Sequence, residues 1–185
     1  FTNQYNLGFT YHKDFNHQNF KALYFKVDGY FNKVENKIIA SPTGNMFRWM
    51  MLNLGEVEIL GTDVNLQGEM HFGKLKIKPL INYTFQRARD FSDRGETYFG
   101  HQIPYTPWHS GTFSLMSDYK DWSFNYSFVY VGERYDGQQN NIQYNYIQPW
   151  YTHDLSIQKK MNWKSHQFKA SFEVNNIFNQ YYDVV

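Results

Sequence analysis

The sequence contains no cysteine, so neither disulfide bonds nor thiolate metal sites can contribute to its fold or chemistry. The sequence also has no marked excess of positive or negative charge, because 18 Lys and Arg residues nearly balance 17 Asp and Glu residues. We therefore expect no nucleic-acid partner, since binding to nucleic acid requires a clear basic excess. No run approaches the roughly 20 consecutive apolar residues of a membrane helix.

The first residues also lack the basic and apolar segments of a signal peptide. If the protein is exported, we expect this chain to be an internal piece of it. What the chain does contain is aromatic side chains, at 21% of all residues, beside a polar mean hydropathy of −0.68. This combination predicts a surface that is aromatic on one side and wet on the other.

Alternation of apolar and polar residues with a period of two runs through most of the chain, which is typical of β-strands because successive side chains point to opposite faces. Residues 122–130 show it most clearly, with an aromatic residue at every second position. We expect one face to point to lipid and to carry Phe124, Tyr126, Phe128, Phe168, Phe172, Leu66 and Ile81. We expect the other to line a lumen and to carry Asn125, Lys169, Glu173, Gln67 and Asn82.

The connections between these segments alternate between short and long. Tight turns fit at residues 16–19, 72–74, 119–121 and 161–165, and longer links at 41–45, 90–100 and 136–148. This spacing predicts an all-β fold, an antiparallel up-and-down meander of about eight strands, with the loop asymmetry of transmembrane barrels. Pro79 falls inside a predicted strand, so we expect a bulge there or a shorter strand.

Other function classes remain open on these patterns alone. A soluble secreted β-sheet module, such as an adhesin or lectin-like piece, is the main alternative, although its apolar face would favour Val, Ile and Leu over Phe, Tyr and Trp. A barrel enzyme ranks third, because no base lies beside a nucleophile in any local signature. We expect no cofactor, and no metal site, because the seven histidines form no ligand spacing on one element.

Specific segments resemble a known family, the TonB-dependent receptors of the bacterial outer membrane. Residues 53–63 resemble a descending strand of that family, and residues 83–90 resemble its Tyr-Thr-Tyr…Ala-Arg-Asp segment. Residues 103–109 are similar to its Pro-x-x-Pro-x-His strand opener, and residues 175–182 to its Asn-Leu-Phe-Asn-x-x-Tyr segment. Four such matches in the family's order span nearly the whole chain and are most similar to Bacteroidetes receptors of the cobalamin and colicin-receptor branch.

The resemblance implies a segment of a roughly 22-stranded transmembrane β-barrel. Residues 1–185 would be its C-terminal portion, without the plug domain and the final strand, and residues 167–182 would form one ascending strand. The implied function is active uptake of a scarce nutrient, such as an iron chelate or cobalamin. The implied partners are outer-membrane lipid, the receptor's own plug and remaining strands, the TonB complex, and a small nutrient ligand.

Ligand-contacting residues do not transfer from the family by motif, because they lie in outer loops that vary with substrate. Aromatic and basic residues at the expected outer loops are candidates for ligand binding, although aromatic packing within the loops explains them at least as well. These candidates are Phe47, Arg48, Tyr98, Phe99, Tyr135, Tyr144 and Tyr146.

Overall fold

The computed structural model describes residues 1–42 and 49–182. Within them it contains ten strands and no helix, so none of the described residues belongs to a helix that could cross a membrane. The strands are β1 (Thr2–Asp14), β2 (Phe20–Pro42), β3 (Trp49–Phe72), β4 (Leu75–Asp90), β5 (His109–Tyr119), β6 (Trp122–Val131), β7 (Arg134–Tyr135), β8 (Tyr146–Ile147), β9 (Trp150–Trp163) and β10 (His166–Val174).

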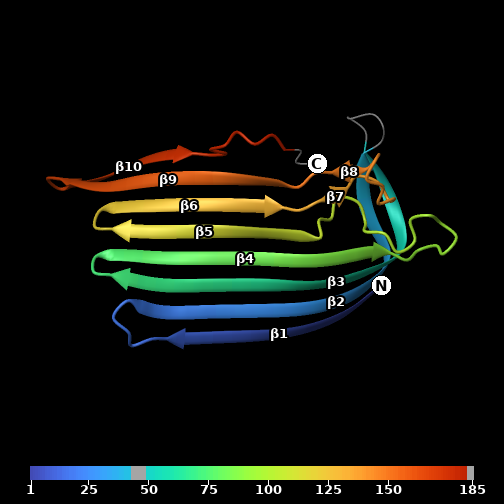
Figure 1. The fold of residues 1–185 in the computed structure, drawn as a ribbon, viewed down its shortest axis with the longest axis horizontal. Coiled ribbons are helices and arrows are strands. Elements are labelled where there is room, and N and C mark those ends of the chain that lie inside the picture. The colour runs from blue at the N-terminus through green and yellow to red at the C-terminus, as the bar shows by residue number, and fades with distance from the viewer. Residues whose placement is uncertain (43–48, 183–185) are drawn as a thin grey trace.

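Eight of these strands form one sheet in the order β1-β2-β3-β4-β5-β6-β9-β10, and every neighbouring pair is antiparallel (Figure 1). The predicted antiparallel meander is therefore confirmed. β7 and β8 form a separate ribbon of two strands within the link between β6 and β9. The period of two did not reveal this ribbon, because each of its strands has only two residues.

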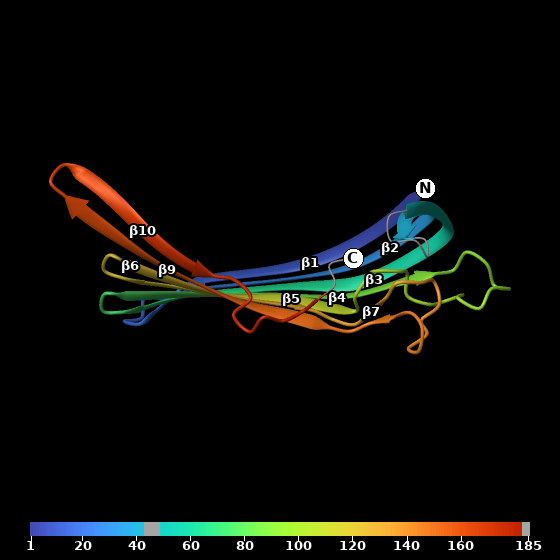
Figure 2. The same ribbon diagram turned by 90° about the horizontal axis from the view of Figure 1, so that it is seen from above.

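The sheet has a turn end and a loop end. At the turn end, strands are joined by tight turns such as Gly73–Lys74 and Lys120–Asp121, as expected from the sequence (Figure 1). At the loop end, residues 91–108 and 132–149 form the long links, which we call the first and second long loops. β2 and β3 have 23 and 24 residues, and their paired ends bend over the loop end. Figure 2 shows the sheet as open and shallowly curved.

The strand register assigns each row of side chains to one face, because directly paired residues point to the same side. Leu66 pairs with Ile81, and their neighbours Asn65 and Asn82 pair on the opposite face. The same alternation continues on the far strands, where Asn125 pairs with Ser156. The predicted division into an aromatic and a polar face is therefore confirmed for the residues we named.

The aromatic face has no second layer of described residues over it. Tyr5, Phe9 and Phe172 are exposed there, and Leu7 is 82% exposed. The only buried apolar cluster in the described chain is small. It lies toward the loop end, because Val57 pairs with Asp90, the last residue of β4, and Ile59 pairs with Ala88. A two-layered sandwich would bury one face of each sheet. This sheet buries neither, as expected for a wall between two different environments.

Pro79 does not cause the expected bulge or shorten its strand. β3 pairs with β4 at Gln67–Leu80 and again at Met70–Ile77 in the same register, and only the pairs between them are missing. Proline has no N–H to donate at that point. Gly68 lies opposite, and a Cβ there would lie 3.3 Å from Cγ of Pro79. The glycine therefore leaves room for the proline ring, and the strand continues.

The expectation of one strand over residues 167–182 is wrong at its C-terminal part, because β10 ends at Val174. Asn176 and Asn179 adopt positive φ angles of 50° and 49°, which interrupt an extended strand. The backbone N–H of Asn176 donates to Oδ1 of Asp154 at 2.7 Å, and its side chain bonds to the backbone of Gln180. These side-chain hydrogen bonds replace the backbone ladder.

Candidate functional site

A chain of amide side chains crosses the polar face of the sheet. Gln67 donates to Oδ1 of Asn65 at 3.0 Å, and Asn65 donates to Oδ1 of Asn82 at 2.5 Å. Asn82 in turn donates to Oγ1 of Thr112 at 3.0 Å, so the chain links β3, β4 and β5. The strand register brings these residues together, because Asn65 pairs with Asn82 and Asn82 with Thr112. The polar face is therefore ordered by its own hydrogen bonds.

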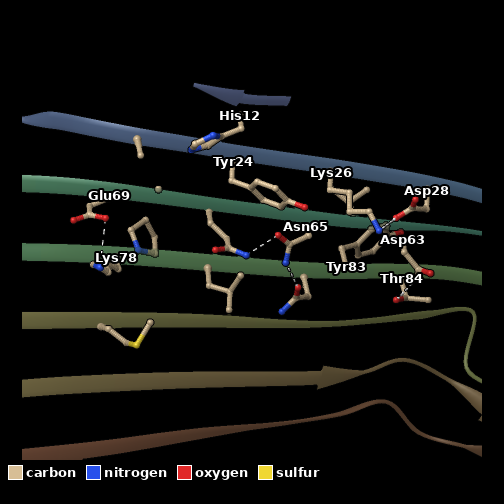
Figure 3. Close-up of a pocket in the computed structure, with 18 residues that line it drawn as sticks. His12, Tyr24, Lys26, Asp28, Asp63, Asn65, Glu69, Lys78, Tyr83 and Thr84 are labelled. Atoms are coloured by element: carbon tan, nitrogen blue, oxygen red, sulfur yellow. Dashed lines mark hydrogen bonds and ion pairs between the residues drawn. The ribbon is translucent and has the colours of Figure 1, made fainter. Parts of the chain in front are cut away.

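A groove of about 860 Å³ lies on this face, lined by residues of β1 to β5 (Figure 3). Charged groups in it are paired. Lys26 Nζ lies 2.7 Å from Asp28, and Lys78 lies 3.4 Å from Glu69. Thr84 donates to Asp63 at 2.6 Å. The groove thus offers an open, hydrogen-bonding wall, and its partly exposed ion pairs stabilise it only weakly.

At the loop end, Gln102 of the first long loop is 1% exposed, and its side chain makes three hydrogen bonds to the backbone. Its Oε1 accepts a hydrogen bond from the backbone N–H of Ala88 at 2.9 Å. Its Nε2 donates to the backbone oxygens of Gln86 and Thr106 at 3.1 and 3.2 Å. A buried amide with all these partners satisfied fixes the loop to the end of β4.

The two long loops are also bonded to each other. The backbone N–H of Gln102 donates to Oδ1 of Asn140 at 2.7 Å, and Nδ2 of Asn140 donates back to the Gln102 oxygen at 3.0 Å. The side-chain amide of Asn140 therefore bonds to both the N–H and the carbonyl oxygen of Gln102, as the backbone of a neighbouring strand would. Tyr105 adds a second link, because its N–H donates to the Tyr135 oxygen at 2.7 Å. The loops form one connected unit.

Of the candidate ligand-binding residues, the structure brings Tyr135 and Tyr146 together. They pair across β7 and β8 with ring centroids 6.0 Å apart. Desolvation and the hydrogen bond from its hydroxyl to Glu133, at 3.1 Å, raise the pKa of Tyr146, so the phenol stays protonated and remains a donor. Tyr144 makes no ring contact with either of them and is 74% exposed.

The other candidates belong to different surroundings. Tyr98 and Phe99 lie in the first long loop, where the Phe99 ring contacts Phe91 edge-on at 5.2 Å. Phe99 thus packs within its own loop, which agrees with aromatic packing rather than ligand binding as the role of this residue. Phe47 and Arg48 lie outside the described residues. No group of three or more described His, Asp or Glu residues is placed to hold a metal ion.

The sequence did not single out Gln102, His101 and Asn140 as the residues that join the loops. An isolated glutamine in a loop carries no local signal of burial, and Asn140 is one of several consecutive amides in residues 138–141. The sequence pointed the other way for the prolines, because residues 103–109 were expected to open a strand. That expectation is wrong, since β5 begins only at His109 and both Pro104 and Pro107 lie in the first long loop.

The comparisons with known proteins agree with this architecture. The family model described as TonB dependent receptor-like, beta-barrel matches residues 1–177. No curated protein sequence matches the chain. Among solved structures, the chain is similar to the ferric citrate transporter FecA in its unliganded form, with 15% identity and a TM-score of 0.70 over 98% of this chain.

Two further structures share the fold. The copper transporter OprC has 19% identity and a TM-score of 0.64, and the FrpB iron transporter from Neisseria meningitidis has 15% identity and a TM-score of 0.57, each over 98% of this chain. The chain spans about a quarter of each of these structures, covering 27%, 26% and 27% of FecA, OprC and FrpB. A two-faced antiparallel meander and a family match over residues 1–177 lead to one conclusion: this chain belongs to the TonB-dependent receptor-like β-barrel family and forms part of the wall of a bacterial outer-membrane barrel.

Proposed function

We propose that the receptor containing this chain imports a scarce nutrient across the outer membrane, driven by TonB. The observation that carries the proposal is the sheet with two different faces. Its aromatic face is suited to lipid, and its polar face, with the hydrogen-bonded amides of Asn65 and Asn82, is suited to a wet lumen. A transport barrel requires both on the same strands.

In this proposal the chain supplies wall and loops, and other parts of the receptor do the rest. Residues 1–185 form the C-terminal portion of a roughly 22-stranded barrel. The plug domain fills the lumen and carries the contact with TonB, and a further strand completes the wall. The motif in residues 175–182, which resembles the family's C-terminal region, supports this placement. The shallow curvature in Figure 2 is suited to a wide barrel.

The loop end faces the cell exterior in this proposal, and the turn end faces the periplasm. Outer-membrane barrels have short periplasmic turns and longer outer loops. Turns such as Lys120–Asp121 and the two long loops follow that asymmetry. The ligand then meets the loop end first. An iron chelate and cobalamin are the leading candidates, and the motifs most similar to Bacteroidetes receptors of the cobalamin branch favour the second.

The test is energised uptake by the full-length receptor. Cells that carry the receptor and an intact TonB system should accumulate a radiolabelled ligand against its gradient. Cells in which TonB is deleted should bind the ligand at the surface without accumulating it. Equal accumulation with and without TonB would contradict the proposal, because a passive pore needs no energy input.

The alternative, a soluble binding module, finds no support in the packing. Such a module would cover its aromatic face with a second layer, yet Leu7 and Phe172 lie exposed on that face. The measurement that separates the two functions is solubility. We expect the full-length receptor to remain in the membrane fraction until detergent is added.

A further inference from the structure

The two long loops line an open cleft that is separate from the groove on the polar face. It has a volume of about 360 Å³ and is lined by Thr97, His101, Gln139, Asn140, Asn141 and Ile142. This size lies within the range of about 300–1,000 Å³ for pockets that bind small ligands. None of the seven candidate residues that the sequence suggested lines it.

Hydrogen bonds hold the walls of this cleft in position. Gln139 from the second loop donates to Oγ1 of Thr97 in the first at 2.7 Å. The backbone N–H of Asn140 donates to Nδ1 of His101 at 3.1 Å, and the side chain of Asn140 is bonded to Gln102. A cleft formed before the ligand arrives avoids the entropic cost of ordering two loops on binding.

The lining of the cleft is polar but carries no carboxylate, ammonium or guanidinium group. It has a hydroxyl, an imidazole, amides and one apolar side chain. Because Nδ1 of His101 accepts a hydrogen bond, Nε2 carries the proton, and it has no partner among the described residues. The amide nitrogen of Asn141 is likewise without a described partner, whereas its Oδ1 accepts the N–H of Gln143 at 2.9 Å. Both groups are free to donate to a ligand.

The two long loops that line the cleft each carry a net negative charge, which disfavours an anion. Acidic residues outnumber basic ones in each long loop, with Asp93 and Glu96 beside Arg94 in the first. The second has two acids, Glu133 and Asp136, and one base, Arg134. At the edge of the cleft, Ile142 is 74% exposed and offers apolar contact. The cleft therefore combines neutral hydrogen-bond donors with one apolar side chain at its edge.

We propose that this cleft binds an uncharged part of the imported ligand that is rich in amide or hydroxyl groups, and that it discriminates against anionic metal chelates. The inference rests on the proposed function, because it names the class of ligand that the receptor would take up. Amide groups would come from a cobalamin-type ligand, and hydroxyl groups from a neutral oligosaccharide. The two sources share the same hydrogen-bonding chemistry.

The experiment measures binding to the purified full-length receptor by titration calorimetry with three probes: cyanocobalamin, maltohexaose and ferric citrate. The variant Asn141→Asp removes the free donor and adds a negative charge, while an oxygen remains to accept the Gln143 N–H. The matched control, Gln143→Glu, makes the same chemical change on the same loop at an exposed position that does not line the cleft.

We expect one of the two uncharged probes to bind, and Asn141→Asp to weaken it roughly tenfold, the effect of about one lost hydrogen bond. Gln143→Glu should leave its affinity unchanged, and ferric citrate should not bind. Binding of cyanocobalamin alone or maltohexaose alone identifies the source of the neutral groups. Equal affinities of Asn141→Asp and the unmodified receptor, preferential binding of ferric citrate, or no binding of any probe would overturn the inference.

These outcomes can be told apart from failure of the proposed function. A receptor that takes up ferric citrate in a TonB-dependent way, with no effect of Asn141→Asp, is a transporter whose cleft has another role. A receptor that binds a neutral probe through the cleft but never accumulates it supports the cleft and contradicts transport.

Discussion

At the scale of single residues, Tyr126 and Asn125 are neighbours on β6 that face opposite surroundings. Tyr126 lies on the aromatic face, where its hydroxyl is 2.6 Å from Nδ1 of His153. Asn125 lies on the polar face and donates to Ser156 at 3.1 Å. The two positions allow a direct test of the assigned faces, because the same residue can be introduced at either one and its effects compared.

Tyr126→Arg should destabilise the folded barrel strongly, because an Arg near the bilayer midplane on the lipid face costs about 2–4 kcal/mol. Asn125→Arg should cost much less, since the new charge enters a wet lumen. The measurement is the folded fraction of the full-length receptor in membranes, from its heat-modifiable migration on gels. Similar losses for the two variants would mean that the faces are assigned wrongly.

Gln102 is the residue whose loss should affect the loop end most. Gln102→Leu keeps a similar volume but leaves the Ala88 N–H and two backbone oxygens without their partner. Each unsatisfied group costs about 1–3 kcal/mol. We expect faster hydrogen exchange in residues 91–108 and 132–149, while the strands of the sheet keep their protection.

The control for that experiment is Gln143→Leu, an exposed position in the second long loop. It should leave exchange in both loops unchanged. An unaltered exchange pattern in Gln102→Leu as well would show that the buried amide does not hold the loops.

At the scale of elements, period two was sufficient to predict the main strands, their order and their faces. The alternation did not predict the segments whose backbone conformation is fixed by side-chain hydrogen bonds rather than by strand pairing. Asn176 ends β10 early by bonding to Gln180, and Asn140 joins two loops by imitating a strand partner. The period of two does not predict such side-chain contacts, and some of them, such as that between Asn140 and Gln102, join residues far apart in the sequence. The sequence around Pro79 likewise could not show that its strand continues, because the space for the proline ring is left by Gly68 on the neighbouring strand.

The tight turns yield a prediction about β-hairpins. Gly73 adopts a positive φ of 62°, and Lys120 and Lys164 adopt 54° and 55° at the equivalent first position of their turns. A lysine is strained in this region, whereas glycine is not. Lys120→Gly should therefore stabilise the receptor by about 1 kcal/mol, after allowance for the entropy of glycine in the unfolded chain.

Asp121→Gly is the matched comparison, because Asp121 is the second residue of the same turn and does not have a positive φ. It should be neutral or slightly destabilising. Urea-induced unfolding in lipid vesicles measures both variants. A stability gain for Asp121→Gly equal to that for Lys120→Gly would show that strain at the turn is not the cause.

At the scale of the whole molecule, the sheet is an open wall whose two edges are β1 and β10. The backbone groups on their outer sides have no partner strand within the described residues, and a membrane interior offers no water to replace one. In the proposed barrel, closure with further strands of the receptor satisfies these edges and gives the curved wall its inside and outside. In that barrel the aromatic face meets lipid and the polar face meets water.

The most direct test of that claim is cysteine scanning along β6 in the full-length receptor in intact outer membranes. The chain has no cysteine of its own, so each introduced thiol in this segment is unique to its position. We predict that cysteines at Ser123, Asn125 and Ser127 react with a water-soluble maleimide, whereas those at Phe124, Tyr126 and Phe128 do not. Labelling without this period of two, or with the opposite phase, would contradict the assignment of the aromatic face to lipid and the polar face to water.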